Sequence, residues 1–173
     1  MTDTSHKAAS QTLREIASWQ PGRGSADSDL LPELSTMVAR SRDLSRNHGI
    51  ASGAMQTLTD NIVGTGFRLS AKPDYKLLGK PKDWEEEWQA KVEGLWRSWS
   101  ETFMCDAAQS LNFHGLTTQV FKSCLINGEA LALALWLPER PVATTIQLIE
   151  PDRLSNPNNS TDSKKLRGGV EID

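Results

Sequence analysis

Four tryptophans recur at helical spacing in the middle of this 173-residue chain. With neighbouring apolar residues they share one face of a helix that we expect to begin near Asp83, where Glu86 completes a capping-box pattern. Each aromatic side chain buries roughly 150–250 Å² when it packs. The helix must therefore dock on another part of a folded structure. Its apolar face consists of Trp84, Trp88, Val92, Leu95, Trp96, Trp99 and Phe103.

The composition is that of a folded protein without a membrane span. Apolar residues make up 38% and charged residues 24% of the chain, and no apolar run approaches the ~20 residues that a span requires. The first twenty residues lack the apolar stretch of a secretory signal, so we expect a cytoplasmic protein or one in a particle assembled there. The net charge of −3 argues against a freestanding nucleic-acid binder, but not against a protein that surrounds DNA.

The N-terminal third predicts an arm followed by a broken helix. Residues 1–29 are rich in small polar residues and predict a flexible arm, with a short helix near residues 13–19. Apolar residues then recur every three to four positions between Ser35 and Ile62, with a break predicted near His48 and Gly49. Gly64 predicts the end of this helix, and 67–71 predicts a strand.

The remaining chain predicts a third helix followed by strands. Asn112 is a good N-cap and Gly128 a good left-handed stop, so we expect a helix between them. Leucines alternate with other residues over 130–137, which indicates a strand, and 144–150 and 169–172 are further strand candidates. The expected fold is α+β, with amphipathic helices packed on a small mixed or antiparallel sheet, in one domain over 30–173.

Six short segments, in this order, resemble the wing region of lambda-family phage portal proteins. They are Arg40, Arg42, Asp43, Leu44, Arg46 and Asn47; Asn61 to Gly66 with Leu69; the helix of Trp96 and Trp99 leading to Cys105 and Asp106; Asn127 to Glu129; Ile146 to Leu154; and Gly168 to Asp173. Weaker similarity begins at Trp19. The resemblance thus covers residues 19–173, and we expect the chain to be the wing-side part of a subunit whose stem, clip and crown lie further on.

The resemblance implies a structural role without enzymatic chemistry or cofactors. Family members form a dodecameric ring at one capsid vertex, through which double-stranded DNA passes non-specifically. The implied partners are further copies of the chain, terminase, capsid or scaffold proteins and tail-connector proteins, with no membrane. The implied location is the virion, with assembly in the host cytoplasm.

Three arginines are the candidate contact residues. Arg42 and Arg46 lie one helical turn apart and Arg40 precedes them, so they form a basic group near the start of the predicted helix. Such a group can contact a neighbouring subunit or phosphate. The alternative is a solvated face paired with Asp43 or with acids of another subunit.

Two other functions stay open at this point. Glu129, Glu150 and Asp152 lie near predicted strand ends, where a small metal-dependent nuclease would place its acids. The alternative for these acids is that they cap turns or pair with Arg140 and Arg153. The chain can also be a truncated prophage remnant that interferes with assembly of the intact portal.

Several smaller motifs favour structural interpretations. Gly64-Thr65-Gly66 is similar to a phosphate loop, but it follows a helix and precedes a strand, which predicts a simple turn. Together with the two cysteines, His48, His114 and Asp106 are candidate metal ligands. Their spacing in the sequence does not contain the paired ligand motif that structural zinc sites usually have. Cys105 and Cys124 are predicted to be buried apolar fillers.

Overall fold

The computed structural model describes residues 12–19, 22 and 24–172, and it has the expected α+β architecture. The chain divides into two compact units, residues 1–35 and 36–173. Helix α1 (Ala26–Asn47) crosses this division. The predicted arm over 1–29 and domain over 30–173 stay predictions, and residues 1–11, 20, 21 and 23 of the arm lie outside the described part.

In the first unit, the helix predicted near residues 13–19 is wrong, since the segment forms only a turn closed by the Ala17 amide donating to the Leu13 carbonyl at 2.8 Å. Helix α1 begins at Ala26 rather than at Ser35. Its start is explained by Ser25, whose hydroxyl accepts the amide hydrogen of Ser28 at 3.2 Å. The polar composition of this segment concealed a helix with a good N-cap.

The predicted break near His48 is confirmed. Helix α1 ends at Asn47 and α2 (Gly49–Ile62) begins at Gly49. Between them, His48 has an extended backbone, and its Nδ1 accepts the amide hydrogen of Ala51 at 3.4 Å. Gly49 is therefore the first residue of a new helix rather than a bend in one continuous helix.

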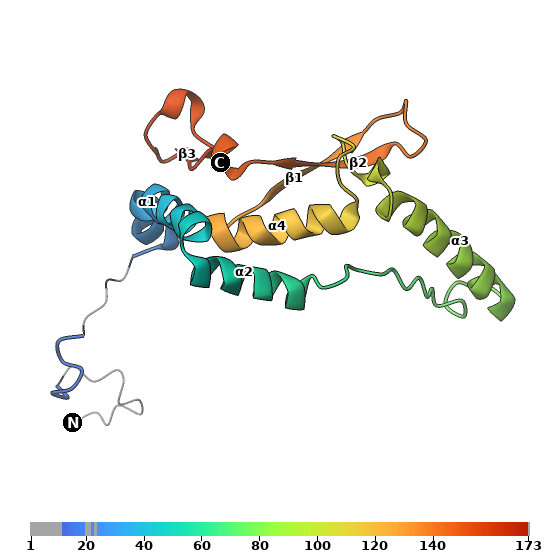
Figure 1. Cartoon of the computed structure of the whole chain (residues 1–173), viewed down its shortest axis with the longest axis horizontal. Helices are drawn as coiled ribbons and strands as arrows, with labels where there is room; N and C mark the ends of the chain where they lie inside the picture. The colour runs from blue at the N-terminus through green and yellow to red at the C-terminus, as the bar shows by residue number, and fades with distance from the viewer. Residues whose placement is uncertain (1–11, 20–21, 23, 173) are drawn as a thin grey trace. The chain divides into compact units, whose positions relative to one another are not determined.

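The strand predicted over 67–71 is wrong as a sheet element. The segment is non-helical and has no sheet partner among the described residues. Figure 1 shows it as part of the long connection from α2 to α3. Its last amide, of Ala71, donates instead to the Glu93 carboxylate at 3.1 Å.

Helix α3 (Lys82–Ser100) carries the tryptophans, and its capping box is wrong because the N-cap is Pro81 and Asp83 lies in the first turn. Trp96 and Trp99 pack on Phe113 with ring centroids 5.1 and 5.5 Å away. All four tryptophans of the helix are half-buried. The row of tryptophans predicted that this helix packs on another part of the fold. The C-terminal half of α3 does so, because it contacts α4 and the short helix η2 (Phe103–Cys105).

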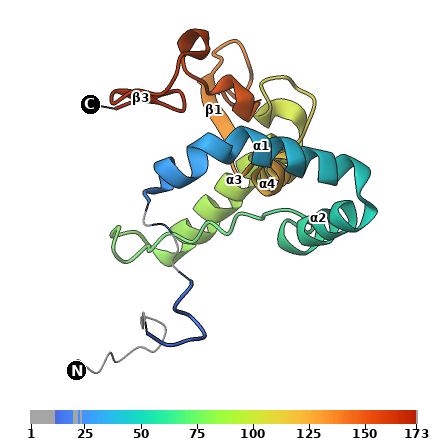
Figure 2. The ribbon, with the colours of Figure 1, turned by 90° about the vertical axis from the view of Figure 1, so that its left-hand side faces the viewer.

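Helix α4 (Phe113–Asn127) and the following hairpin match the predictions closely. The Asn112 side chain accepts the amide hydrogen of Gly115 at 2.9 Å, and Gly128 ends the helix with φ of 82°. Strands β1 (Leu131–Trp136) and β2 (Thr144–Ile149) then pair antiparallel, with Leu131 opposite Ile149. Figure 2 shows α4 between this hairpin and the α2–α3 connection.

The C-terminal segment is built from short elements. It contains η3 (Pro151–Arg153), η4 (Pro157–Asn159) and a hairpin of β3 (Leu166–Arg167) and β4 (Val170–Glu171). The turn residues Gly168 and Gly169 both have positive φ, as a tight hairpin turn requires. The last predicted strand therefore has its partner immediately before it in the sequence.

The described residues bury few apolar side chains. Those buried are Val63, Ala71, Cys105 and Leu116. Cys124 is exposed, so its prediction as a buried filler is wrong. No described helix is long and apolar enough to cross a membrane.

Candidate functional site

An ion pair joins helix α1 to the segment after the hairpin. Arg42 Nη1 and Nη2 donate to the two carboxylate oxygens of Asp152 at 2.7 and 2.8 Å, a fork-to-fork geometry. Arg42 Nε donates to Asn127 Oδ1 at 2.7 Å. The guanidinium therefore fixes α1 against both the end of α4 and η3.

The Asn127 side chain extends this contact into the turn before β1. Its Nδ2 donates to Ser123 Oγ at 3.1 Å, and Ser123 Oγ donates to the Glu129 carbonyl at 2.8 Å. Asn127 thus serves as the last residue of α4 and as a bridge from Arg42 to the hairpin. The Asn-Gly-Glu turn is held by side chains as well as by its own backbone.

The protonation of this group follows from its geometry. The hydrogen bond from Arg42 lowers the pKa of the Asp152 carboxyl, outweighing the effect of partial burial. The same hydrogen bond raises the pKa of Arg42, with the negative charges of Asp152 and Glu150 adding to it. Both shifts favour the charged forms, so the pair is ionised at neutral pH.

The three candidate arginines do not form one patch. Arg42 is half-buried and engaged by Asp152, whereas Arg40 and Arg46 are exposed. Arg46 Nε donates back to the Arg42 carbonyl at 3.2 Å, and Asp43 accepts from Asn47 rather than from an arginine. Arg40 and Arg46 are therefore the two arginines that remain open to a partner, and such a contact stays a prediction.

The three acids suggested for a nuclease are not arranged as a metal site. Both oxygens of Asp152 are bound by Arg42. Among the residues that the structure describes, no group of three or more His, Cys, Asp or Glu is placed to hold a metal ion. Asp152 thus forms a structural pair, although with Arg42 rather than with the expected Arg140 or Arg153.

A buried carboxylate, that of Asp106, organises the loop after η2. Asp106 is 4% exposed. Its oxygens accept the amide hydrogens of Ala108, Ser110 and Leu111 at 3.0 Å, and the Ser110 hydroxyl at 2.8 Å. Burial alone would raise the pKa of Asp106, but these hydrogen bonds outweigh it and lower the pKa.

The backbone of the same loop is tied to strand β2. Ala107 donates its amide hydrogen to the Ile146 carbonyl at 2.9 Å. Arg140, from the hairpin turn, donates to the carbonyls of Asp106 and Ala107 at 2.9 and 2.7 Å. The Asp106 loop therefore locks the hairpin onto the end of α3 and η2. In the sequence Asp106 was marked by the Cys105-Asp106 pair of the family resemblance and by the metal-site group that was set aside, and neither pointed to this role.

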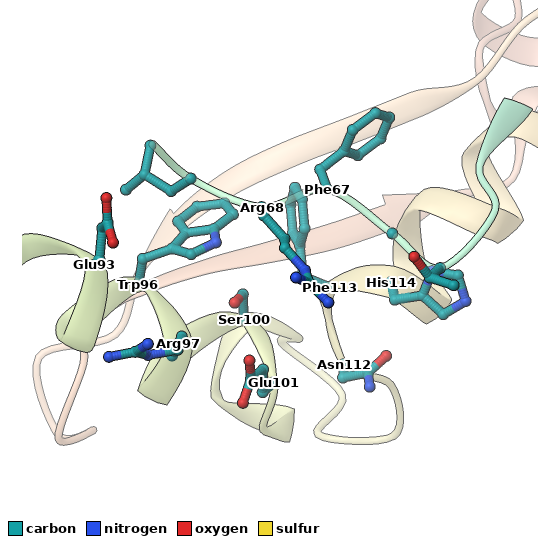
Figure 3. Close-up of a pocket in the computed structure, with 13 residues that line it drawn as sticks. Phe67, Arg68, Glu93, Trp96, Arg97, Ser100, Glu101, Asn112, Phe113 and His114 are labelled. Carbon is teal, nitrogen blue, oxygen red and sulfur yellow. The ribbon is translucent and has the colours of Figure 1, made fainter. Parts of the chain in front are cut away.

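A pocket of about 480 Å³ lies between the α2–α3 connection and the facing ends of α3 and α4. Figure 3 shows Phe67 highest at this pocket, while the Arg68 side chain extends from the connection down past the ring of Phe113. Its lining carries both signs of charge, Arg68 and Arg97 with Glu93 and Glu101. The Gly64–Gly66 turn precedes this segment and opens no helix, so the geometry of a phosphate loop is absent here.

Large apolar side chains are exposed over several elements of the second unit. Ile50 is 80% exposed, Phe67 61% and Trp136 71%. Others are Leu58, Ile62, Leu69, Leu77, Leu78, Leu95, Phe103 and Leu133. These side chains are spread over α2, the α2–α3 connection, α3, η2 and β1, and together they leave much apolar surface that another polypeptide could cover.

Comparison with known proteins gives a consistent result. The family described as "Phage portal protein, lambda family" matches residues 12–173. The chain is 35% identical over 162 residues to portal protein B of Escherichia phage lambda, covering 91% of this chain and 30% of that protein. It is 35% identical to the portal protein of Escherichia phage N15, over 91% of this chain and 31% of that protein.

A more distant relative agrees with these. The probable portal protein of Halomonas phage phiHAP-1 is 24% identical over 176 residues, covering all of this chain and 33% of that protein. The chain thus spans about a third of the length of the curated relatives that it matches.

Proposed function

Because the chain belongs to the lambda family of phage portal proteins, we propose that it forms the part of a portal subunit that packs side by side with its copies in a closed ring. Family membership gives a structural portal role. That this chain packs into a ring is our proposal beyond that role. Its contacts are head-to-tail, with one surface of a subunit meeting a different surface of the next.

The observation that carries this proposal is the imbalance between core and surface. The described residues bury four apolar side chains but expose large ones on α2, α3, β1 and the connection between α2 and α3. A chain that buries so little of its own apolar surface gains stability when neighbours cover it. Side-by-side packing in a ring covers such surface in every subunit.

The finer parts of the proposal follow from the family. We propose that the ring is dodecameric, lies at one capsid vertex of the virion and surrounds double-stranded DNA during packaging and ejection. Terminase, scaffold or capsid proteins and tail-connector proteins are the proposed partners, and assembly takes place in the host cytoplasm. The proposed protein has no catalytic role, because the packaging motor supplies ATP hydrolysis.

Arg40 and Arg46 are the proposed polar contacts at the subunit boundary. Both are exposed on α1, and neither is in an ion pair among the described residues. A carboxylate of the adjacent subunit would pair with them at a partly desolvated boundary, where charge complementarity fixes orientation more than affinity.

Negative-stain electron microscopy of the purified chain tests the ring. The proposal predicts particles with a central opening and one rotational symmetry in class averages. Particles that stay the size of a single chain at every concentration would contradict it.

A further inference from the structure

Among the described residues, the rest of the chain forms hydrogen bonds with the outer edge of β2 but not with the outer edge of β1. Leu137 donates its amide hydrogen to the Ala143 carbonyl at 2.8 Å, and this pair continues the register of the strands. In an antiparallel ladder, residues at every second position then point their backbone groups outward. On β2 these are Thr144, Ile146 and Leu148.

The outer edge of β2 is occupied by the chain itself. The Thr144 carbonyl accepts from Trp99 Nε1 at 2.8 Å, and the Ile146 carbonyl accepts from the Ala107 amide at 2.9 Å. A short parallel bridge joins Asp106 to Ile146. The fold therefore occupies the Thr144 and Ile146 part of this edge, while no described residue bonds to the outward backbone groups of Leu148.

The outer edge of β1 is open. Its outward groups belong to Ala132, Ala134 and Trp136, and no described residue bonds to them on that side. The strand reads Leu-Ala-Leu-Ala-Leu-Trp, without charge or proline. Edge strands that avoid pairing usually carry such protecting residues, so this edge is suited to receive another strand.

The chain also contains a strand-like segment without a sheet. Residues 67–71 alternate apolar and polar side chains, as Phe-Arg-Leu-Ser-Ala. The backbone of 67–70 has no hydrogen-bond partner among the described residues, and these four residues are exposed. Helix α4 lies between this segment and β1 in both views (Figures 1 and 2), so a single copy does not bring them together.

We propose that 67–70 of one copy, whose backbone has no hydrogen-bond partner in the described part of its own chain, pairs with the open edge of β1 in the adjacent copy. Each copy supplies one segment that can add to a sheet and one open sheet edge, on β1, that can receive such a segment. The two lie at different places on the copy, so the contact is head-to-tail and closes into a ring or continues as a filament. Phe67 and Leu69 share one face of the added strand, and the exposed Leu133 and Trp136 lie on opposite faces of β1, so the pairing places Phe67 and Leu69 on the same face as one of these two apolar side chains. This inference rests on the proposed ring and names the contact that builds it.

Directed cross-linking tests the pairing. In a Cys124→Ser background, Leu69→Cys and Ala134→Cys place thiols at the centres of the two segments. We expect the mixed chains to form a covalent dimer under mild oxidation, at least about fivefold more than either variant alone. Leu77→Cys is the matched control, because it lies in the same connection and is more exposed than Leu69, at 85% against 38%.

A second pair of variants separates pairing from folding. Ala134→Pro removes the outward amide hydrogen but leaves the β1–β2 bonds, whereas Ala134→Val keeps that hydrogen. Loss of assembly in the proline variant alone, with both folded by circular dichroism, supports the pairing.

The outcomes distinguish the two proposals. Rings without a preferred 69–134 cross-link, or equal assembly of the two Ala134 variants, would overturn the strand pairing and leave the ring in place. A chain that neither assembles nor cross-links would overturn both.

Discussion

Arg42 and Asp152 form a two-pronged ion pair, with distances of 2.7 and 2.8 Å, between residues 110 positions apart. Asp152→Asn removes the charge and one acceptor while keeping the size. Because the Asp152 side chain is 56% exposed, we expect a loss of only about 0.5–1 kcal/mol in unfolding free energy, measured by urea denaturation at pH 7.

The same pair gives a pH dependence of defined sign. Arg42 lowers the pKa of Asp152, so its stabilising effect is complete above the unfolded value of about 3.9 and is lost as pH falls through the lower folded value. The difference in unfolding free energy between the unaltered chain and Asp152→Asn should therefore disappear at low pH. Asp43→Asn is the control, and an equal loss for it would show that the pair with Arg42 is not responsible.

Asp106 is expected to contribute more than Asp152, because it is buried and accepts four hydrogen bonds. Asp106→Asn keeps one acceptor but places an amide among donors, which should cost about 2 kcal/mol or more in unfolding free energy. Its stabilising effect also has the acid dependence of a lowered pKa.

The matched control for Asp106 is Asp74→Asn. The Asp74 carboxylate also accepts backbone hydrogens, from Lys76 and Leu77, but it is exposed. Thermal unfolding followed by circular dichroism should show a much smaller shift for Asp74→Asn. Equal shifts would mean that burial of the Asp106 carboxylate is not what matters.

Two glycines should respond to alanine with opposite signs. Gly53 lies inside α2 and has no atom within 4 Å of an added Cβ, so Gly53→Ala should stabilise by about 0.5–1 kcal/mol. Gly128 has the same open surroundings but a φ of 82°, so Gly128→Ala should destabilise by about 1 kcal/mol. Urea denaturation of both variants checks this, and a stabilised Gly128→Ala would contradict the left-handed cap.

Arg40 and Arg46 should affect assembly rather than folding. Changing both to Ala removes two exposed charges with no ion-pair partner in the described part of the chain. We expect assembly to weaken severalfold in sedimentation velocity, with a smaller dependence on salt, while the unfolding free energy stays within about 0.5 kcal/mol.

Lys164→Ala with Lys165→Ala is the control for that pair, since it removes the same charge from another exposed segment. Equal weakening by both double variants would indicate a general charge effect. Arg42 is left unchanged, because its loss would break the internal pair.

The parts of the fold that the sequence predicted are those with local causes. Asn112 and Gly128 bound α4 because one caps and the other adopts the left-handed conformation. Alternating leucines place β1, and the interruption at His48 and Gly49 separates α1 from α2. Where the local signal was polar, as before Ala26, the start of the helix was missed.

The contacts that position the candidate site depend on residues far apart in the chain. Arg42 was recognised as a candidate, but its partner Asp152 lies after six further elements and was assigned to other pairs. Asp106 and Arg140 meet because β2 lies beside the loop after η2. The strand predicted over 67–71 was wrong, because a strand needs a hydrogen-bonded neighbour and the local sequence does not supply one.

Native mass spectrometry of the unaltered chain over a concentration series is the sharpest test of ring formation. We expect a closed assembly of fixed subunit number whose population grows with concentration. A strict monomer at all concentrations would contradict the claim that this part of the portal subunit carries the ring contacts.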